Sequence, residues 1–149
     1  QTEGTSNWKI SALTSIGLVL SVLQLLSGTK VREHIDVLAK KGVAIGMDNF
    51  HLLGTTFNVH RVLAIATGIC LIAIWYANRE MTRRPKTSLI VLATFAILVI
   101  QALTGIANVR FGFPATAQLI HVVFGSVTLV AFIHLTIHEF KSKRLQYVN

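Results

Sequence analysis

The chain has 149 residues, of which 52% are hydrophobic and only 13% are charged, and its formal net charge is +8. Soluble domains carry roughly a quarter of charged residues, so this composition excludes an ordinary soluble protein and predicts an all-α membrane protein. The basic residues stand in short segments beside apolar stretches, without the interleaved aromatic residues that bind single strands, so we expect no nucleic-acid partner.

Four apolar stretches are long enough to cross a bilayer, whose hydrocarbon core requires about 20 helical residues. The predicted spans are residues 10–27, 57–77, 87–109 and 115–138. We therefore expect a bundle of four transmembrane helices that forms one domain over residues 1–149, with the lipid bilayer as its first partner.

The first two spans are joined by a long connection, residues 28–56. Within it Val31, Ile35 and Leu38 recur at helical spacing, with charged residues on the other faces. This pattern predicts a short amphipathic helix that lies on the membrane surface and could cover the outer end of the bundle. By contrast, only F-G-F-P joins the third and fourth spans.

The short turn between the second and third spans carries four basic residues. They are Arg79, Arg83, Arg84 and Lys86. By the positive-inside rule we place this turn in the cytoplasm of a cell (inner) membrane, and with four spans both termini lie on the same side. The chain begins with Gln1 and has no signal-peptide pattern, so we expect a processed product or a piece of a longer chain.

The first and third spans end alike, with a common Q-x-L-[ST]-G signature. The repeat pairs Gln24 with Gln101, Ser27 with Thr104 and Gly28 with Gly105. Each copy is followed by a span that opens with a histidine. This repetition predicts two pseudo-repeated helical hairpins that build a site at their own interface.

The two histidines are His60, in H-R-V-L-A-I-A-T-G, and His121, in H-V-V-F-G. Because their spans run in the same direction, both imidazoles are expected near the outer face, at depths that differ by only ~4–5 Å. Neutral imidazole is an axial ligand of haem iron, and a four-helix bundle can hold a haem between facing helices. The pair therefore predicts one haem site; the alternative is two structural histidines with other partners. His134 and His138 lie ~20–25 Å deeper without a counterpart in the second span, so structural roles are expected for them.

Several neighbours could complete such a site. Gly125, one turn below His121, leaves room for a flat macrocycle, although small residues also serve close helix packing. Gln24 and Gln101 could bond the second nitrogen of a histidine, or could join helices as polar contacts. Arg61 and Arg110, with Arg32 as a further candidate, lie at the outer rim, where a guanidinium matches the carboxylates of haem propionates, although arginine also commonly extends to the interface.

Glu33, in V-R-E-H-I-D, is the only glutamate on the predicted outer side. A carboxylate above the bundle could abstract or shuttle a proton. The commoner case is a surface carboxylate paired with a neighbouring cation, so both interpretations stay open.

Four segments carry a resemblance to a known family: G-T-K-V-R-E-H-I-D, F-N-V-H-R, I-Q-A-L-T-G and L-I-H-V-V-F-G. Together they resemble the haem A synthase family, over about Ile10 to Leu135. The resemblance implies oxidation of a methyl group of haem O to the formyl group of haem A. It further implies that His60 and His121 correspond to a haem-binding histidine pair, and that Glu33 falls near the family's outer-loop glutamate.

Typical members of that family have two four-helix halves, one that holds haem b and one that receives haem O. The chain resembles the C-terminal, haem b-carrying half, and it lacks the cysteine pair that many members carry in an outer loop. We therefore expect a homo-oligomer or a second four-helix half. The alternatives are a small membrane cytochrome b subunit attached to a terminal oxidase or another respiratory complex, and a structural subunit with a vestigial pocket.

Overall fold

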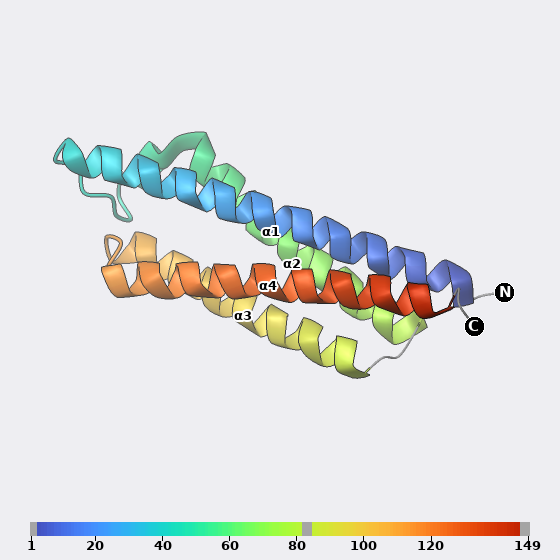
Figure 1. The fold of residues 1–149 in the computed structure, drawn as a ribbon. Coiled ribbons are helices and arrows are strands. Elements are labelled where there is room, and N and C mark those ends of the chain that lie inside the picture. The colour runs from blue at the N-terminus through green and yellow to red at the C-terminus, as the bar shows by residue number, and fades with distance from the viewer. Residues whose placement is uncertain (1–2, 82–84, 147–149) are drawn as a thin grey trace.

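The computed structural model describes residues 3–81 and 85–146, and this part of the chain is helical without a strand. Its elements are α1 (Glu3–Lys40), the short 3₁₀ helix η1 (Phe50–Leu53), α2 (Gly54–Met81), α3 (Pro85–Arg110) and α4 (Ala115–Gln146) (Figure 1). Each of the four α-helices is long and apolar enough to cross a membrane. The predicted all-α, four-span membrane architecture is confirmed.

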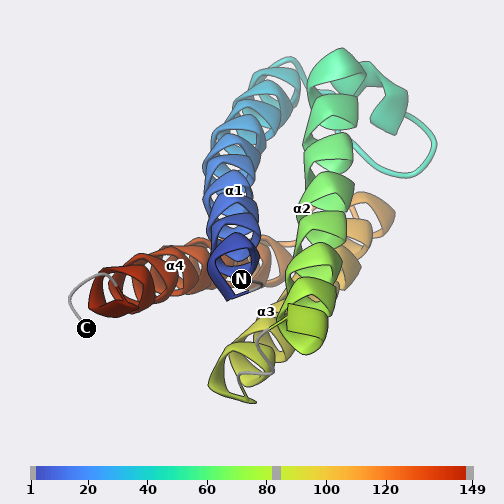
Figure 2. The same cartoon turned by 90° about the vertical axis from the view of Figure 1, so that its right-hand side faces the viewer.

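The helices form two antiparallel hairpins, α1 with α2 and α3 with α4 (Figures 1 and 2). The hairpins meet mainly where α1 packs on α4 and α2 packs on α3. One end of the bundle carries the α1–α2 connection and the α3–α4 turn, and we call it the histidine end because His60 and His121 lie toward it. The first turns of α1 and the last turns of α4 lie at the other end.

The long connection differs from the prediction. Residues 31–38 are not a separate helix on the membrane surface, because α1 continues without a break from Glu3 to Lys40. The apolar side chains of Val31 and Ile35 are buried against Ile45 and Leu53, so protein contacts replace the lipid contacts that the amphipathic pattern suggested. The helix ends just before Gly42, whose φ of +78° is a left-handed conformation that glycine adopts readily.

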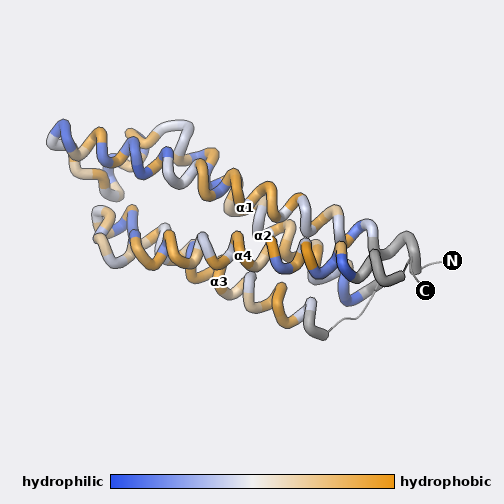
Figure 3. Tube along the Cα trace, in the orientation of Figure 1, coloured by the Kyte–Doolittle hydropathy of each residue, from blue (hydrophilic) through white to orange (hydrophobic). Residues whose placement is uncertain are grey.

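Hydrophobic residues predominate along the middle of the helices (Figure 3). Large side chains such as Val62 (64% exposed), Leu89 (69%) and Val130 (63%) face outward. The buried positions include many small polar residues, and hydroxyls such as Thr67 and Thr94 donate to carbonyls of their own helices. An apolar exterior over a close-packed interior of small residues is the arrangement that a bilayer requires.

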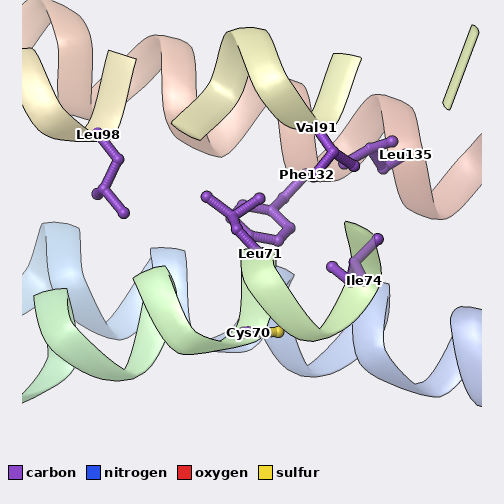
Figure 4. Packing of buried hydrophobic residues seen from close by; sticks show 7 residues of the cluster. All are labelled: Cys70, Leu71, Ile74, Val91, Leu98, Phe132 and Leu135. Carbon is purple, nitrogen blue, oxygen red and sulfur yellow. The ribbon is translucent and has the colours of Figure 1, made fainter. Parts of the chain in front are cut away.

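The larger of the two buried apolar clusters lies in the half of the bundle away from the histidine end, and Figure 4 shows its packing. Its buried members are Cys70, Leu71, Ile74, Val91, Leu98, Phe132 and Leu135. The Phe132 ring of α4 is fully buried and lies directly against Gly17 of α1. A Cβ atom at position 17 would overlap the Phe132 ring, so only glycine allows this approach of α1 to α4.

We predict that Gly17→Ala lowers the free energy of unfolding in detergent micelles by roughly 1–3 kcal/mol, because the enclosed Phe132 ring must move. Gly68→Ala is the matched control, since its Cβ would meet Leu98 at an ordinary 3.5 Å. That variant should unfold no more easily than the parent, because alanine favours helix over glycine by about 1 kcal/mol. Equal unfolding curves for the two variants, followed by circular dichroism, would contradict this account of the α1–α4 contact.

Candidate functional site

His60 and His121 face each other between the two hairpins. Each lies six positions after the first residue of its helix, Gly54 in α2 and Ala115 in α4. The ring centroids are 6.1 Å apart and the ring planes are inclined by 60°. The two helices begin at equivalent distances from their histidines, so the offset expected from the predicted span boundaries does not arise.

The ring of His121 is oriented by α3. Its Nδ1 lies 2.7 Å from the main-chain oxygen of Gln101 and 3.3 Å from Oγ1 of Thr104. A carbonyl oxygen can only accept a hydrogen bond, so Nδ1 carries the proton and donates it. Nε2 therefore keeps its lone pair, which makes it the nitrogen able to bind a metal.

The ring of His60 is held in the same way by α1. Its Nδ1 lies 3.1 Å from Oγ of Ser27, and that hydroxyl donates its own proton to the carbonyl oxygen of Gln24. Ser27 must then accept from Nδ1, so the proton again lies on Nδ1. Nε2 of His60 has only a long contact of 3.5 Å, to Nε2 of Gln24. Both hairpins thus present the same tautomer, with the lone pair on Nε2.

The two glycines of the repeat make room for the rings. A Cβ atom at Gly28 would lie 3.2 Å from Cε1 of His60, and one at Gly105 would lie 3.1 Å from Cε1 of His121. Gly125 makes room for a different side chain, because a Cβ atom added there would lie 3.0 Å from Nε2 of Gln101. The room predicted for a macrocycle at Gly125 is thus shared with the Gln101 side chain.

A cavity of about 1160 Å³, its open mouth included, surrounds the histidine pair. All four helices line it, and its walls are mainly apolar. The lining includes both histidines, Gln24, Gln101, Gly28, Gly105 and Gly125. Three buried oxygens of the lining have no hydrogen-bond partner: Oε1 of Gln24, Oε1 of Gln101 and Oδ1 of Asn108. Buried polar atoms of this kind usually find a partner, so these oxygens leave three hydrogen-bond acceptors available inside the cavity.

Sequence reasoning did not select Asn108. It lies in I-A-N-V-R at the end of α3, where it is buried and lines the cavity. An amide inside an otherwise apolar span is costly without a partner, and this signal could have identified it.

The charged candidates other than Arg32 do not line the cavity. Glu33 is exposed and pairs with Lys30, Oε2 to Nζ at 2.8 Å. The guanidinium of Arg61 lies over the Phe57 ring, 5.8 Å from its centroid, and Arg110 is exposed at the end of α3. Neither arginine nor Glu33 is among the residues that line the cavity, whereas Arg32 is.

The remaining span histidines form a separate group. The rings of His134 and His138 stack along α4 with centroids 6.4 Å apart, and Nδ1 of His138 lies 3.4 Å from Oε1 of Glu139. None of the three lines the cavity. In residues 3–81 and 85–146 no cluster of three or more histidine, cysteine or acidic side chains could hold a metal ion.

Comparison with known proteins gives one match. The family model COX15-CtaA, described as cytochrome oxidase assembly protein, matches residues 1–133. No curated protein and no solved structure matched the chain. The family model covers most of the 149 residues, including all of the residues that line the cavity. The chain therefore belongs to the COX15-CtaA family of cytochrome oxidase assembly proteins, the haem A synthase family.

Proposed function

We propose that the chain is a haem-binding membrane protein of haem A synthesis, in which Nε2 of His60 and Nε2 of His121 would together hold the iron of one haem. The observation that carries the proposal is the pair of facing imidazoles inside the cavity, both with Nδ1 engaged and with the lone pair on Nε2. The family's role in cytochrome oxidase assembly agrees with it.

The residues present fit a haem. Metal–imidazole bonds of about 2 Å on both sides of one metal put two ring centroids roughly 6 Å apart, and the observed separation is 6.1 Å. The described residues offer no third metal-binding side chain near the pair, which suits a metal that brings four ligands of its own. Walls that are mainly apolar suit a porphyrin, which is a large flat hydrophobic group.

The surrounding groups would hold the two histidine rings in place. The carbonyl oxygen of Gln101 and the hydroxyls of Ser27 and Thr104 fix the ring orientation and the tautomer, and they increase the basicity of Nε2. Bound haem would supply one-electron redox chemistry in this apolar pocket.

The cofactor role is favoured over the substrate role for this haem. The only titratable side chains in the cavity lining are Arg32, His60 and His121, and no lining residue is a carboxylate. Oxidation of the methyl group of haem O to the formyl group of haem A has to release protons, and Glu33 is turned away in its pair with Lys30. We therefore assign haem b to this cavity, and haem O and haem A to a second four-helix unit, either a copy of this chain or another half.

A second candidate function uses the same site. An electron-transferring cytochrome b subunit of a terminal oxidase or respiratory complex also needs two histidines that can bind haem iron through Nε2. It needs no carboxylate in the cavity lining, and this lining has none. For both functions we place the histidine end toward the outer face of the cell membrane and the termini in the cytoplasm. This orientation rests on the basic turn of the sequence, of which Arg83 and Arg84 lie outside the described residues.

We predict that His60→Ala and His121→Ala each abolish the low-spin bis-histidine absorption spectrum of the purified protein, because each removes one axial ligand. His134→Ala is the matched control: it removes a histidine from α4 outside the cavity and should leave the spectrum unchanged. A normal low-spin spectrum in both alanine variants of the pair would rule out the proposed ligation.

We predict that Gly28→Ala and Gly105→Ala both weaken haem binding, by about 10-fold, a size typical of changes next to metal ligands. In each variant the new Cβ presses on Cε1 of the adjacent histidine and turns the ring from its present orientation. Haem titration of the apoprotein, followed at the Soret band, measures the affinities, and Gly46→Ala, with open space around its Cβ, is the control. A loss in only one of the two variants would show that the hairpins do not contribute equally.

We predict that cells without the chain accumulate haem O and lose haem A, because methyl oxidation stops. The measurement is chromatography of the extracted haems, with a strain carrying the parent gene as the reference. Normal haem A together with slowed respiration would instead support the cytochrome b function.

A further inference from the structure

We propose that the cavity is filled sideways from the bilayer, through the seam between α1 and α4, by a planar amphiphile whose carboxylate is received by Arg32. The inference rests on the proposed haem binding and adds to it the route of entry and the residue that binds the acidic edge of the ligand.

The exposure of the lining residues defines the mouth of the cavity. Four side chains of the lining are exposed: Leu25, Thr29 and Arg32 of α1, and Val122 of α4. Leu25 is 37% exposed and Val122 57%. The lining residues of α2 and α3 are all buried or half-buried. The cavity is therefore open along the α1–α4 seam and closed along the α2–α3 side.

The histidine end of the cavity is covered by apolar side chains. Val31, Ile35, Phe57 and Phe113 line the cavity there and pack with Ile45 and Leu53 of the connection; we call these six residues the cap. Ile45 is 4% exposed and Leu53 is 1% exposed. The connection also reaches the α3–α4 turn, since a Cβ at Gly112 would lie 3.7 Å from the main-chain oxygen of Ile45. Entry along the bundle axis would have to break this packing.

The seam suits a ligand that is dissolved in the membrane. Leu25 and Val122 present apolar side chains where the spans face lipid, so a flat hydrophobic group can pass between them without entering water. Entry through the cap would instead expose the buried apolar side chains of Ile45 and Leu53 to water, which is unfavourable. The seam is the route with the lower cost.

Arg32 lies at the end of this opening, where its guanidinium pairs with the carboxylate of Asp36. Its guanidinium contacts both oxygens of Asp36, Nη2 to Oδ1 at 3.0 Å and Nε to Oδ2 at 3.2 Å, and the two side chains are 52% and 49% exposed. Exposed ion pairs of this kind contribute little to stability, so a ligand carboxylate can replace Asp36 at small cost. The ligand carboxylate would then keep the bidentate hydrogen bonds that a guanidinium and a carboxylate favour.

The first test measures how fast the apoprotein in liposomes takes up haemin dissolved in the same liposomes. Leu25→Trp and Val122→Trp narrow the seam and should slow uptake at least 10-fold. The matched controls are Leu26→Trp on α1 and Val130→Trp on α4, exposed positions outside the lining, and they should load at the parental rate. Parental rates in both seam variants, or faster uptake when the cap is loosened by Leu53→Ala, would overturn the proposed route.

The second test separates the route from haem binding itself. A fatty acid with a photoreactive acyl chain, placed in the liposomes, should label Thr67 and Leu98, which are buried and line the cavity on its closed side. Val122→Trp should remove this labelling. If the parent binds no haemin but is labelled in this way, the proposed function fails and the route stands; absence of labelling at both residues refutes the route.

The third test concerns Arg32. Arg32→Gln should lower the affinity for haemin about 10-fold and leave the affinity for its dimethyl ester unchanged, because the ester has no carboxylate to bind. Arg79→Gln, at the opposite end of α2 where the guanidinium lies over Trp75, is the control and should change neither affinity. Equal losses for haemin and its ester would mean that Arg32 acts on the fold and not on the carboxylate.

Discussion

The site depends on the contact between each histidine and the Q-x-L-[ST]-G segment of the helix beside it. Gly105 follows Gln101 by one helical turn, and without a side chain there the His121 ring can approach the Gln101 carbonyl oxygen to 2.7 Å. The hydroxyl of Thr104 adds a second contact at Nδ1. Glycine, hydroxyl and carbonyl thus act as one unit that fixes a tautomer, and the first hairpin repeats the glycine and the hydroxyl contact around His60. The repeated sequence is explained by this shared geometry and not by helix packing alone.

There is room for this unit because the bundle is packed differently at its two ends, the histidine end and the end away from it. Away from the histidine end, Gly17 lets α1 approach Phe132, and the core cluster fills the space between the hairpins. Toward the histidine end, the cavity and the two rings occupy that space. The closed half holds the helices in register, so the open half can keep a cavity without collapsing. A packed end and an end with a cavity can share one apolar outer surface, because a surface that faces lipid needs no polar side chains.

Sequence patterns predicted the parts of the structure that depend on local composition. The four spans follow from apolar length, and the histidine pair follows from chain direction and the repeat. Tertiary contacts decided the rest. The amphipathic pattern of Val31 and Ile35 is real, but whether its apolar face meets lipid or protein depended on Ile45 and Leu53, which no local pattern links to it. The placement of Arg61 and Arg110 outside the lining depended on the rotation of each helix about its axis, which a list of residues near a span end does not contain.

The repeat also limits what the cavity can bind, since two equivalent hairpins present equivalent groups to opposite sides of one ligand. A metal in a planar macrocycle satisfies this condition, because it offers the same bond to a ligand on either face. The edge of such a ligand is not symmetric, and the repeat departs from symmetry at the corresponding places. Counted from Gly28 and Gly105, Arg32 corresponds to Val109, and Asn108 corresponds to Val31. All four line the cavity. The first hairpin thus supplies a cation to the lining and the second an amide. A haem held between the hairpins as proposed would meet like groups on its two faces and unlike groups at its edges.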